Sequence, residues 1–299
     1  MKKNIVAMML TLCFAVSAVA CSSKADEAPE ETAVVTEETT EEAPAEETEE
    51  ATEETSEEAT EETSEEATEE TTEEAAEETE AAGEVMTHDD FVAAEVDTEV
   101  TVETYVQAKQ GWWEDNGVGQ ASIYTQAEDG AYFLYNMPCT EEEYNQLNEG
   151  TKIRVTGYKS EWEGEVEITD AKFEILDGNF VAEAKDVTAE LAADTLIDSQ
   201  NEFVSFKDMT VEPSTDADGN EVAFLYNYDG SGEQGSDLYF NVSADGNTYT
   251  FTVESYLCDK DSDVYKAVEG LNVGDVVDME GFLYWYQGVN PHITSVTVK

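Results

Sequence analysis

The sequence predicts a mostly β protein with two tandem five-stranded barrels behind a long acidic segment. From Val85 onward, valines, aromatic residues and glycines replace a run of glutamate and threonine, and apolar and polar residues alternate as in half-buried strands. Roughly 215 residues remain after this change, which favours two small domains over one large core. One long motif also occurs twice in this region.

The repeated motif gives the strongest evidence for two related domains. The pattern L-N-x-G-x-x-I-x-V-x-G-Y begins at Leu147, and L-N-x-G-x-x-V-x-M-x-G-F begins at Leu271. Cys139 and Cys258 lie alike in the two halves, each after an aromatic strand and before a predicted short helix. We therefore predict one fold present twice, in a first domain over 85–179 and a second over 180–299.

Each copy is predicted to contain strands on both sides of a short helix. Thr140 and Glu143 have the spacing of a capping box at a helix start, and Asp245-Gly246 is typical of a hairpin turn. In the first copy we predict strands at 99–109, 120–126, 131–136, 152–161 and 165–176, with a helix at 140–147. In the second we predict strands at 203–212, 221–228, 238–243 and 248–256, a helix at 262–271 and a closing pair of strands.

Five strands with a helix between the third and fourth is the element order of the OB fold. The motif at 147–158 resembles the entry to the fourth OB strand, and Gly157 and Gly281 fit strands that must bend sharply to close a barrel. Residues 85–299 thus resemble OB-like domains of secreted bacterial lipoproteins. A pair of β-sandwich domains is the alternative.

The first 20 residues have the parts of an export signal: basic Lys2 and Lys3, an apolar run over 5–16, and small residues before Cys21. The sequence A-V-A-C ending at Cys21 resembles the lipobox of bacterial lipoproteins, with Ala18 where that family usually has leucine. The resemblance implies a signal peptide over 1–20, lipidation of Cys21, and an extracytoplasmic protein anchored to the membrane. An ordinary secretory signal cut near Ala20 is the alternative.

The segment that follows, 21–84, consists almost entirely of Glu, Thr, Ala and Ser. Between Ser22 and Glu84 it has 28 acidic residues against the single Lys24. Alanine and threonine methyl groups cannot form a core, and the like charges repel one another. We predict a disordered, extended tether.

The sequence offers little for catalysis or metal binding. His88 and His292 lie in different segments without a nucleophile motif, and Cys139 and Cys258 lack the spacing of zinc ligands. The acidic run 259–263 lacks the Gly and Glu of an EF-hand loop, so we read it as a helix start. We predict no catalytic residues, no metal site, no cofactor, two free buried thiols and no enzyme activity. Hydrolysis by a carboxylate pair is a third-ranked function, since an acidic chain always offers such pairs.

The net charge of residues 85–299 indicates which partners the folded part can bind. From Val85 onward there are 44 acidic residues against 10 basic ones, and phosphate binding relies on Lys and Arg. We therefore predict no nucleic-acid partner.

Aromatic residues provide the remaining functional signal. OB barrels bind ligands along the second and third strands and in the loops between strands one and two and strands four and five. The candidate ligand-binding residues in these loops are Trp112, Trp113, Trp162, Trp285 and Tyr286. The leading hypothesis is a membrane-anchored binding module for a glycan, peptide or protein. In the alternative, the aromatic residues only cap the barrels and the protein is a structural or accessory envelope component.

Overall fold

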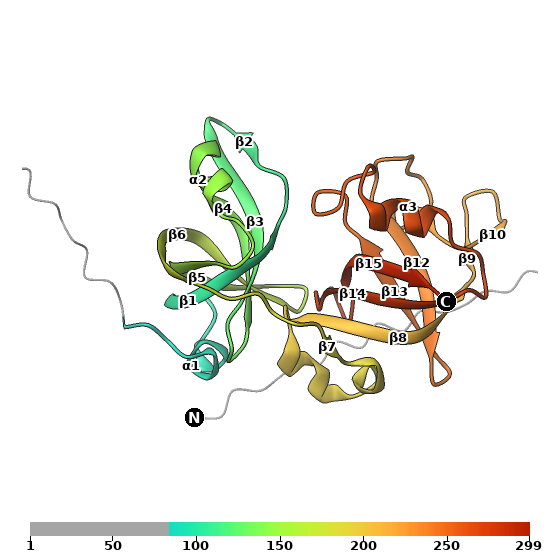
Figure 1. Ribbon diagram of the computed structural model, residues 1–299, viewed down its shortest axis with the longest axis horizontal. Coiled ribbons are helices and arrows are strands. Elements are labelled where there is room, and N and C mark those ends of the chain that lie inside the picture. The colour runs from blue at the N-terminus through green and yellow to red at the C-terminus, as the bar shows by residue number, and fades with distance from the viewer. Residues whose placement is uncertain (1–83) are drawn as a thin grey trace, which may run out of the picture. The chain divides into compact units, whose positions relative to one another are not determined.

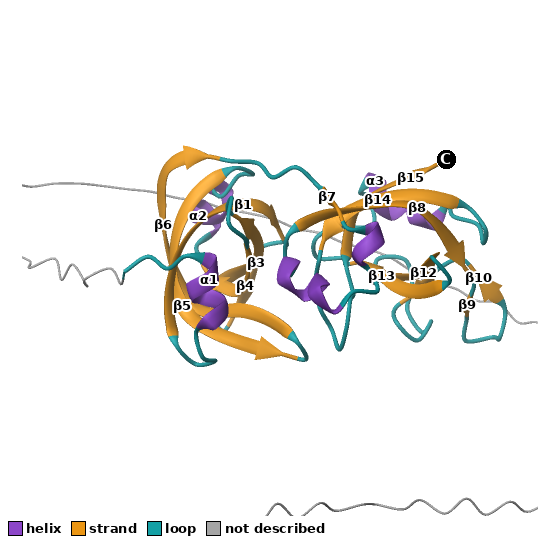
Figure 2. Ribbon diagram, turned by 90° about the horizontal axis from the view of Figure 1, so that it is seen from below, coloured by secondary structure: helices purple, strands orange, loops and turns teal. Residues whose placement is uncertain are grey.

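The computed structural model describes residues 84–299, which belong to one compact unit. The predicted signal peptide, Cys21 and the acidic tether lie outside the described residues. Strands predominate in the described part of the chain, and they form two large sheets and one two-stranded sheet (Figures 1 and 2). None of the helices in this part is long and apolar enough to cross a membrane.

The first sheet closes into a five-stranded barrel, barrel 1. Its strands are β1 (Glu99–Lys109), β3 (Val118–Gln126), β4 (Ala131–Pro138), β5 (Thr151–Trp162) and β6 (Glu165–Asn179). β1 pairs with β5 and β3, β3 with β4, and β5 with β6, while β4 and β6 pair in parallel and complete the ring. Helix α2 (Glu141–Gln146) lies between the third and fourth barrel strands, and β2 (Trp113–Asp115) lies in the loop between the first and second.

The second sheet repeats this topology as barrel 2. Its strands are β8 (Phe203–Glu212), β12 (Leu238–Ala244), β13 (Asn247–Val253), β14 (Val276–Phe282) and β15 (His292–Val298). β12 pairs with β8 to close the ring, β13 and β15 pair in parallel, and helix α3 (Asp263–Glu269) again lies between the third and fourth strands. The predicted mostly β fold with two OB-like barrels is confirmed.

The smaller elements lie between and beside the barrels. They are α1 (His88–Ala93), β7 (Lys185–Asp186), the 3-10 helices η1 (Thr188–Glu190) and η2 (Asp194–Ser199), and β9 (Ser214–Thr215), β10 (Glu221–Val222) and β11 (Leu225–Tyr226). The strand predicted at 221–228 is wrong, because only two-residue pieces form there, outside the barrel ring. Gly230, Gly232 and Gly235 turn the chain immediately afterwards, so the second barrel strand begins only at Leu238.

Helices α1 and α2 both begin at a threonine whose side chain caps the helix. The Thr140 and Glu143 side chains form the predicted capping box of α2. Thr87 and Asp90 do the same for α1, which lies at the other end of barrel 1 from α2 (Figures 1 and 2). The buried Lys159 ammonium donates to three carbonyls at the end of α1, at 2.8–3.0 Å, and so fixes that helix to barrel 1.

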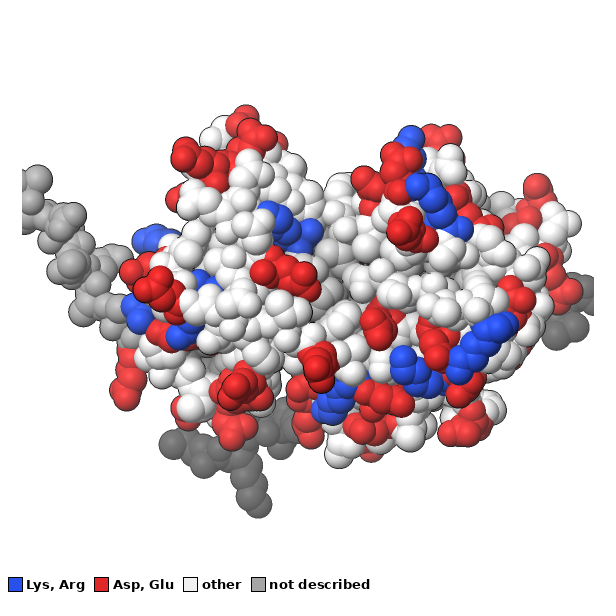
Figure 3. All heavy atoms as spheres, viewed as in Figure 1, with Lys and Arg blue, Asp and Glu red and all other residues white. Residues whose placement is uncertain are grey.

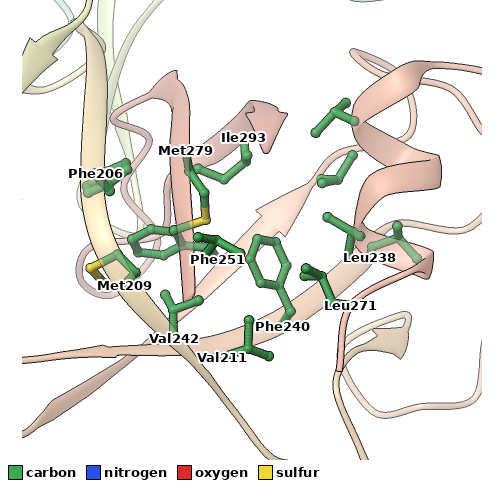
Figure 4. Packing of buried hydrophobic residues seen from close by; sticks show 14 of the residues in the cluster. Phe206, Met209, Val211, Leu238, Phe240, Val242, Phe251, Leu271, Met279 and Ile293 are labelled. Carbon is green, nitrogen blue, oxygen red and sulfur yellow. The ribbon is translucent and has the colours of Figure 1, made fainter. Parts of the chain in front are cut away.

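Each barrel has its own hydrophobic core, built from the side chains that point inward along its strands. In barrel 2, Phe206, Phe240, Phe251, Met279 and Ile293 converge on the axis (Figure 4). The motif residues that correspond in the two copies have the same role, because Ile153 and Val277 are both fully buried. The repeated motif therefore encodes an inward face of the fourth strand.

The repeated glycines mark sharp bends, as predicted. A Cβ on Gly157 would lie 2.7 Å from the carbonyl oxygen of Thr169, and one on Gly281 would lie 2.2 Å from that of His292. At both positions the pairing between the fourth and fifth strands shifts register. Close backbone approach at the bend thus requires glycine.

A third buried cluster joins the two barrels. Tyr124 and Phe133 are paired across β3 and β4, and their rings project from the outer face of barrel 1 onto Phe282 of barrel 2. The Tyr124 ring stacks on Phe282 with centroids 4.4 Å apart, and its hydroxyl lies 2.8 Å from Nδ1 of His292. The outer face of the second and third strands of barrel 1 therefore packs against barrel 2.

Candidate ligand-binding groove

A groove with a volume of about 1190 Å³ runs between the two barrels, and residues of both line it. The lining comes from corresponding parts of the two copies: the loops between the first and second strands, the second or third strand, and the loops between the fourth and fifth strands. These are the regions with which OB barrels bind ligands. We call this feature the interbarrel groove.

The outer face of β12 and β13 forms the floor of the groove. Tyr239 pairs with Thr252 and Asn241 with Thr250, and all four side chains line the groove. The residues between them along each strand point into the core of barrel 2, because side chains alternate between the faces of a strand. The Thr250 hydroxyl donates to Asn241 Oδ1 at 2.8 Å. The floor is thus a patterned surface of hydroxyl and amide groups.

Aromatic rings from both barrels stand along the groove. Trp162, at the end of β5, contacts Tyr286 of barrel 2 with centroids 5.1 Å apart, yet the two residues remain 53% and 45% exposed. Trp113, on β2, is 43% exposed and also lines the groove. The backbone N–H of Gln287 donates to the Glu163 carbonyl at 2.7 Å, which ties the two aromatic loops together.

The structure thus brings together three of the five aromatic residues predicted to bind, namely Trp113, Trp162 and Tyr286. Trp112 instead packs half-buried against the core of barrel 1 and donates its indole N–H to the Cys139 carbonyl. Trp285 packs half-buried against the core of barrel 2. Both of these tryptophans support the loops and do not line the groove.

Sequence reasoning missed the floor of the groove. Tyr239 and Thr252 are not among the predicted ligand-binding residues, although the predicted strands 238–243 and 248–256 contain them. Alternation along those strands would have identified their outward faces, on the strand pair with which OB barrels bind. Tyr228 and Tyr256 line the groove from loops and gave no periodic signal.

Two carboxylates, Asp237 and Glu254, lie at one end of the floor strands and line the groove. Asp237 and Glu254 directly precede and follow the paired residues Leu238 and Val253, so they continue the same register. Glu254 is 8% exposed and its Oε2 accepts from Gln110 Nε2 of barrel 1 at 3.0 Å. Burial, and secondly the charge of Asp237, raise the pKa of Glu254 to about 7. No Lys or Arg is among the residues that line the groove.

A third carboxyl group, Glu165, is buried at the junction of the barrels. Its Oε2 accepts from the backbone N–H of Trp285 at 2.9 Å and from Gln200 Nε2 at 3.2 Å. Burial raises the pKa of Glu165 to about 8. Its Oε1 and the Oδ1 of neighbouring Asn201 are both buried without a hydrogen-bond partner. A proton on Oε1 would satisfy both atoms if it were donated to Asn201. Burial favours this neutral form and outweighs the hydrogen bonds from Asn201, Trp285 and Gln200, which favour the ionised one.

His292 and the cysteines have the environments of structural groups. Burial lowers the pKa of His292 to about 3, so its ring is neutral; it stacks on Tyr284 with centroids 4.2 Å apart. Cys139 and Cys258 are free, as predicted, although Cys258 is only partly buried. Burial raises the pKa of both thiols to about 11. Within residues 84–299, no three His, Cys, Asp or Glu side chains come together as a metal site.

No protein-family model and no curated protein sequence matches the chain. Similar solved structures include a murine DNA-binding protein bound with double-stranded DNA, at 8% identity and a TM-score of 0.32, over 67% of this chain and 94% of that one. The p204 HINb domain matches at 9% identity and a TM-score of 0.30, over 69% and 100%. A replication protein A heterotrimer bound to single-stranded DNA matches at 11% identity and a TM-score of 0.29, over 67% and 49%.

This comparison corrects one prediction. Two of these structures are described as complexes with DNA, so the prediction that the chain has no nucleic-acid partner is wrong as an exclusion and is withdrawn. The net charge of a whole domain does not describe one face of it; Figure 3 shows acidic and basic groups on both barrels and a mostly uncharged surface over the upper part of the boundary between them. At these identities the likeness itself is one of fold.

Proposed function

We propose that residues 84–299 form a binding module that holds a glycan in the interbarrel groove. The observation that carries this proposal is the convergence of the binding regions of two OB-like barrels on one groove of about 1190 Å³. That volume is slightly above the usual range for small-molecule sites, which suits an oligomeric ligand. Barrel 2 provides the polar floor and barrel 1 provides the exposed tryptophans Trp113 and Trp162, so the complete site needs both barrels.

The chemistry of the groove supports a sugar ligand. Exposed rings such as Trp113 and Trp162 offer flat apolar faces, while Asn241, Thr250 and Thr252 offer neutral donors and acceptors beside them. A sugar ring has an apolar face and a rim of hydroxyl groups, so it matches both kinds of surface at once. Aromatic rings with few rotatable bonds also lose little conformational entropy on binding.

We further propose that the module works outside the cytoplasm, carried by a lipid on Cys21 and separated from the membrane by the acidic tether. This part of the proposal is supported by the export signal and the lipobox resemblance of the sequence alone. A multiply acylated cysteine gives a stable anchor, because each buried methylene contributes about 0.8 kcal/mol. Mass spectrometry of the protein from membranes tests it: an unmodified Cys21, or one retained behind its signal, contradicts the anchor.

Binding is tested with the mature chain, 21–299, carrying Cys21→Ser to prevent lipidation. Calorimetric titration uses a panel of cell-wall and plant oligosaccharides, with single-stranded DNA as a separate arm. We expect Trp113→Ala and Tyr286→Ala to weaken saccharide binding about tenfold each, as for aromatic contacts in a buried site. Tyr158→Ala is the matched control, because Tyr158 is exposed on barrel 1 and does not line the groove. Absence of saccharide binding, or equal losses in the control, contradicts the proposal.

A further inference from the structure

The floor of the groove carries an uncompensated pair of acids. Asp237 and Glu254 continue the β12–β13 register, and cross-strand neighbours on one face have Cβ atoms roughly 5 Å apart. Their hydrogen-bond donors are all uncharged: Ser255 donates to Asp237 through its N–H and its hydroxyl, and Gln110 and the Tyr256 backbone N–H donate to Glu254. No Lys or Arg lines the groove to offset the two charges, and burial lowers the pKa of the lining His292 to about 3, which keeps its ring neutral.

Tyrosine rings surround the same part of the groove. Tyr239, on β12, lies two residues after Asp237 in the sequence. Tyr256, beyond the end of β13, lies two residues after Glu254. Tyr256 is 72% exposed and Tyr228, which also lines the groove, is 71% exposed. The face of an aromatic ring attracts a cation, and carboxylates beside such rings add to that attraction. The two carboxylates and the tyrosine rings therefore both favour a cationic ligand group.

Electrostatics makes this arrangement selective. Two neighbouring carboxylates repel each other and each disfavours the ionised form of the other. A cationic group placed between them would remove this repulsion and would donate hydrogen bonds to the carboxylates. An anionic group at the same place would be repelled by both acids, and a neutral group would leave the charge pair unbalanced.

We propose that the ligand carries a primary amine, as an amino-sugar glycan does, and that Asp237 and Glu254 bind its ammonium group beside Tyr239 and Tyr256. This inference rests on the proposed glycan function and narrows it to a chemical class. The aromatic walls then bind sugar rings, while the acid pair distinguishes a free amine from an acetylated one. The two acids are specificity-determining residues on this account.

The experiment compares two probes that differ only in acetylation: a β-1,4-linked glucosamine hexamer and its fully N-acetylated counterpart. With the mature chain carrying Cys21→Ser, we expect the free-amine hexamer to bind at least tenfold more tightly at pH 7, with an affinity that falls as salt is raised. Asp237→Asn and Glu254→Gln should each remove most of that preference, measured as the ratio of the affinities for the two hexamers in the same variant.

Asp245→Asn is the matched control. It removes the same charge from the turn of the same β12–β13 hairpin, where Asp245 is exposed and does not line the groove. If the acetylated hexamer binds as well as the free amine, or if the control abolishes the preference equally, the amine inference is overturned and the glycan function stands. If neither hexamer nor any other saccharide binds, both fail. Circular dichroism confirms that each variant is folded.

Discussion

The protonation of Glu165 makes the stability of this protein depend on pH in a specific way. In the unfolded chain the carboxyl group titrates near 4.5, whereas burial raises its pKa to about 8 in the folded protein. The folded state therefore keeps a proton that the unfolded state releases between these two pH values. Stability must then fall as pH rises through this window, by about 1.4 kcal/mol per pH unit, and level off above pH 8.

Glu165→Gln isolates this contribution. The glutamine amide is neutral at every pH, accepts from the Trp285 N–H through its oxygen, and presents an N–H₂ group to Asn201 Oδ1. We expect the variant to match wild type near pH 4.5 and to be more stable by roughly 4 kcal/mol at pH 8. Burial also raises the pKa values of Glu167 and Glu254 to about 7, but both residues are present in both proteins, so the difference reports Glu165 together with its repulsion by Glu167.

Urea unfolding at half-unit steps from pH 4.5 to 8.5, followed by tryptophan fluorescence, measures the difference directly. Glu161→Gln, at an exposed position on the adjoining β5 strand, is the matched control and should follow the wild-type curve. Parallel curves for Glu165→Gln and wild type across the window would refute the assignment of a proton to Glu165. A variant that is less stable at pH 8 would show that the folded protein prefers the ionised carboxylate.

Three further outcomes follow from the contacts described. Gly281→Ala should lower the free energy of unfolding by about 3 kcal/mol or more, because its Cβ would lie 2.2 Å from the His292 carbonyl oxygen; thermal melting checks it, and an unchanged melting temperature refutes it. Lys159→Met should cost about 2 kcal/mol by removing the donor to three carbonyls of α1, and hydrogen exchange should increase first in that helix. Tyr124→Phe should cost about 1–2 kcal/mol by leaving a buried nitrogen of His292 unpaired, and a silent substitution would contradict the role given to that contact.

Much of the fold could be predicted because the same sequence motif occurs in both barrels. The motif at 147–158 and 271–282 combines a buried alternation with a glycine at the bend, and both features follow from local sequence. The loop over 213–237 could not be predicted, since its short apolar alternation at 221–226 resembles a barrel strand until three glycines turn the chain. Local pattern does not reveal which strand completes a ring.

The groove was predicted only in part, for a different physical reason. Trp113 and Trp162 could be selected because tryptophan in a polar loop is unusual, but sequence does not distinguish them from Trp112 and Trp285, which pack inward. Exposure depends on neighbours that are distant in the chain. The acid pair could not be predicted either, because an acidic sequence offers many carboxylates and only the folded β12–β13 hairpin brings Asp237 near Glu254.

The contact of Tyr124 and Phe133 with barrel 2 has a consequence for valency. These residues lie on the second and third strands of barrel 1, the face that corresponds to the groove floor of barrel 2. A duplicated binding domain would ordinarily offer two equivalent sites, but here one copy uses its face to hold the other. On the proposed binding function, the chain should therefore bind one ligand per molecule despite its two barrels, and stronger attachment to a polymeric target would require several molecules acting together.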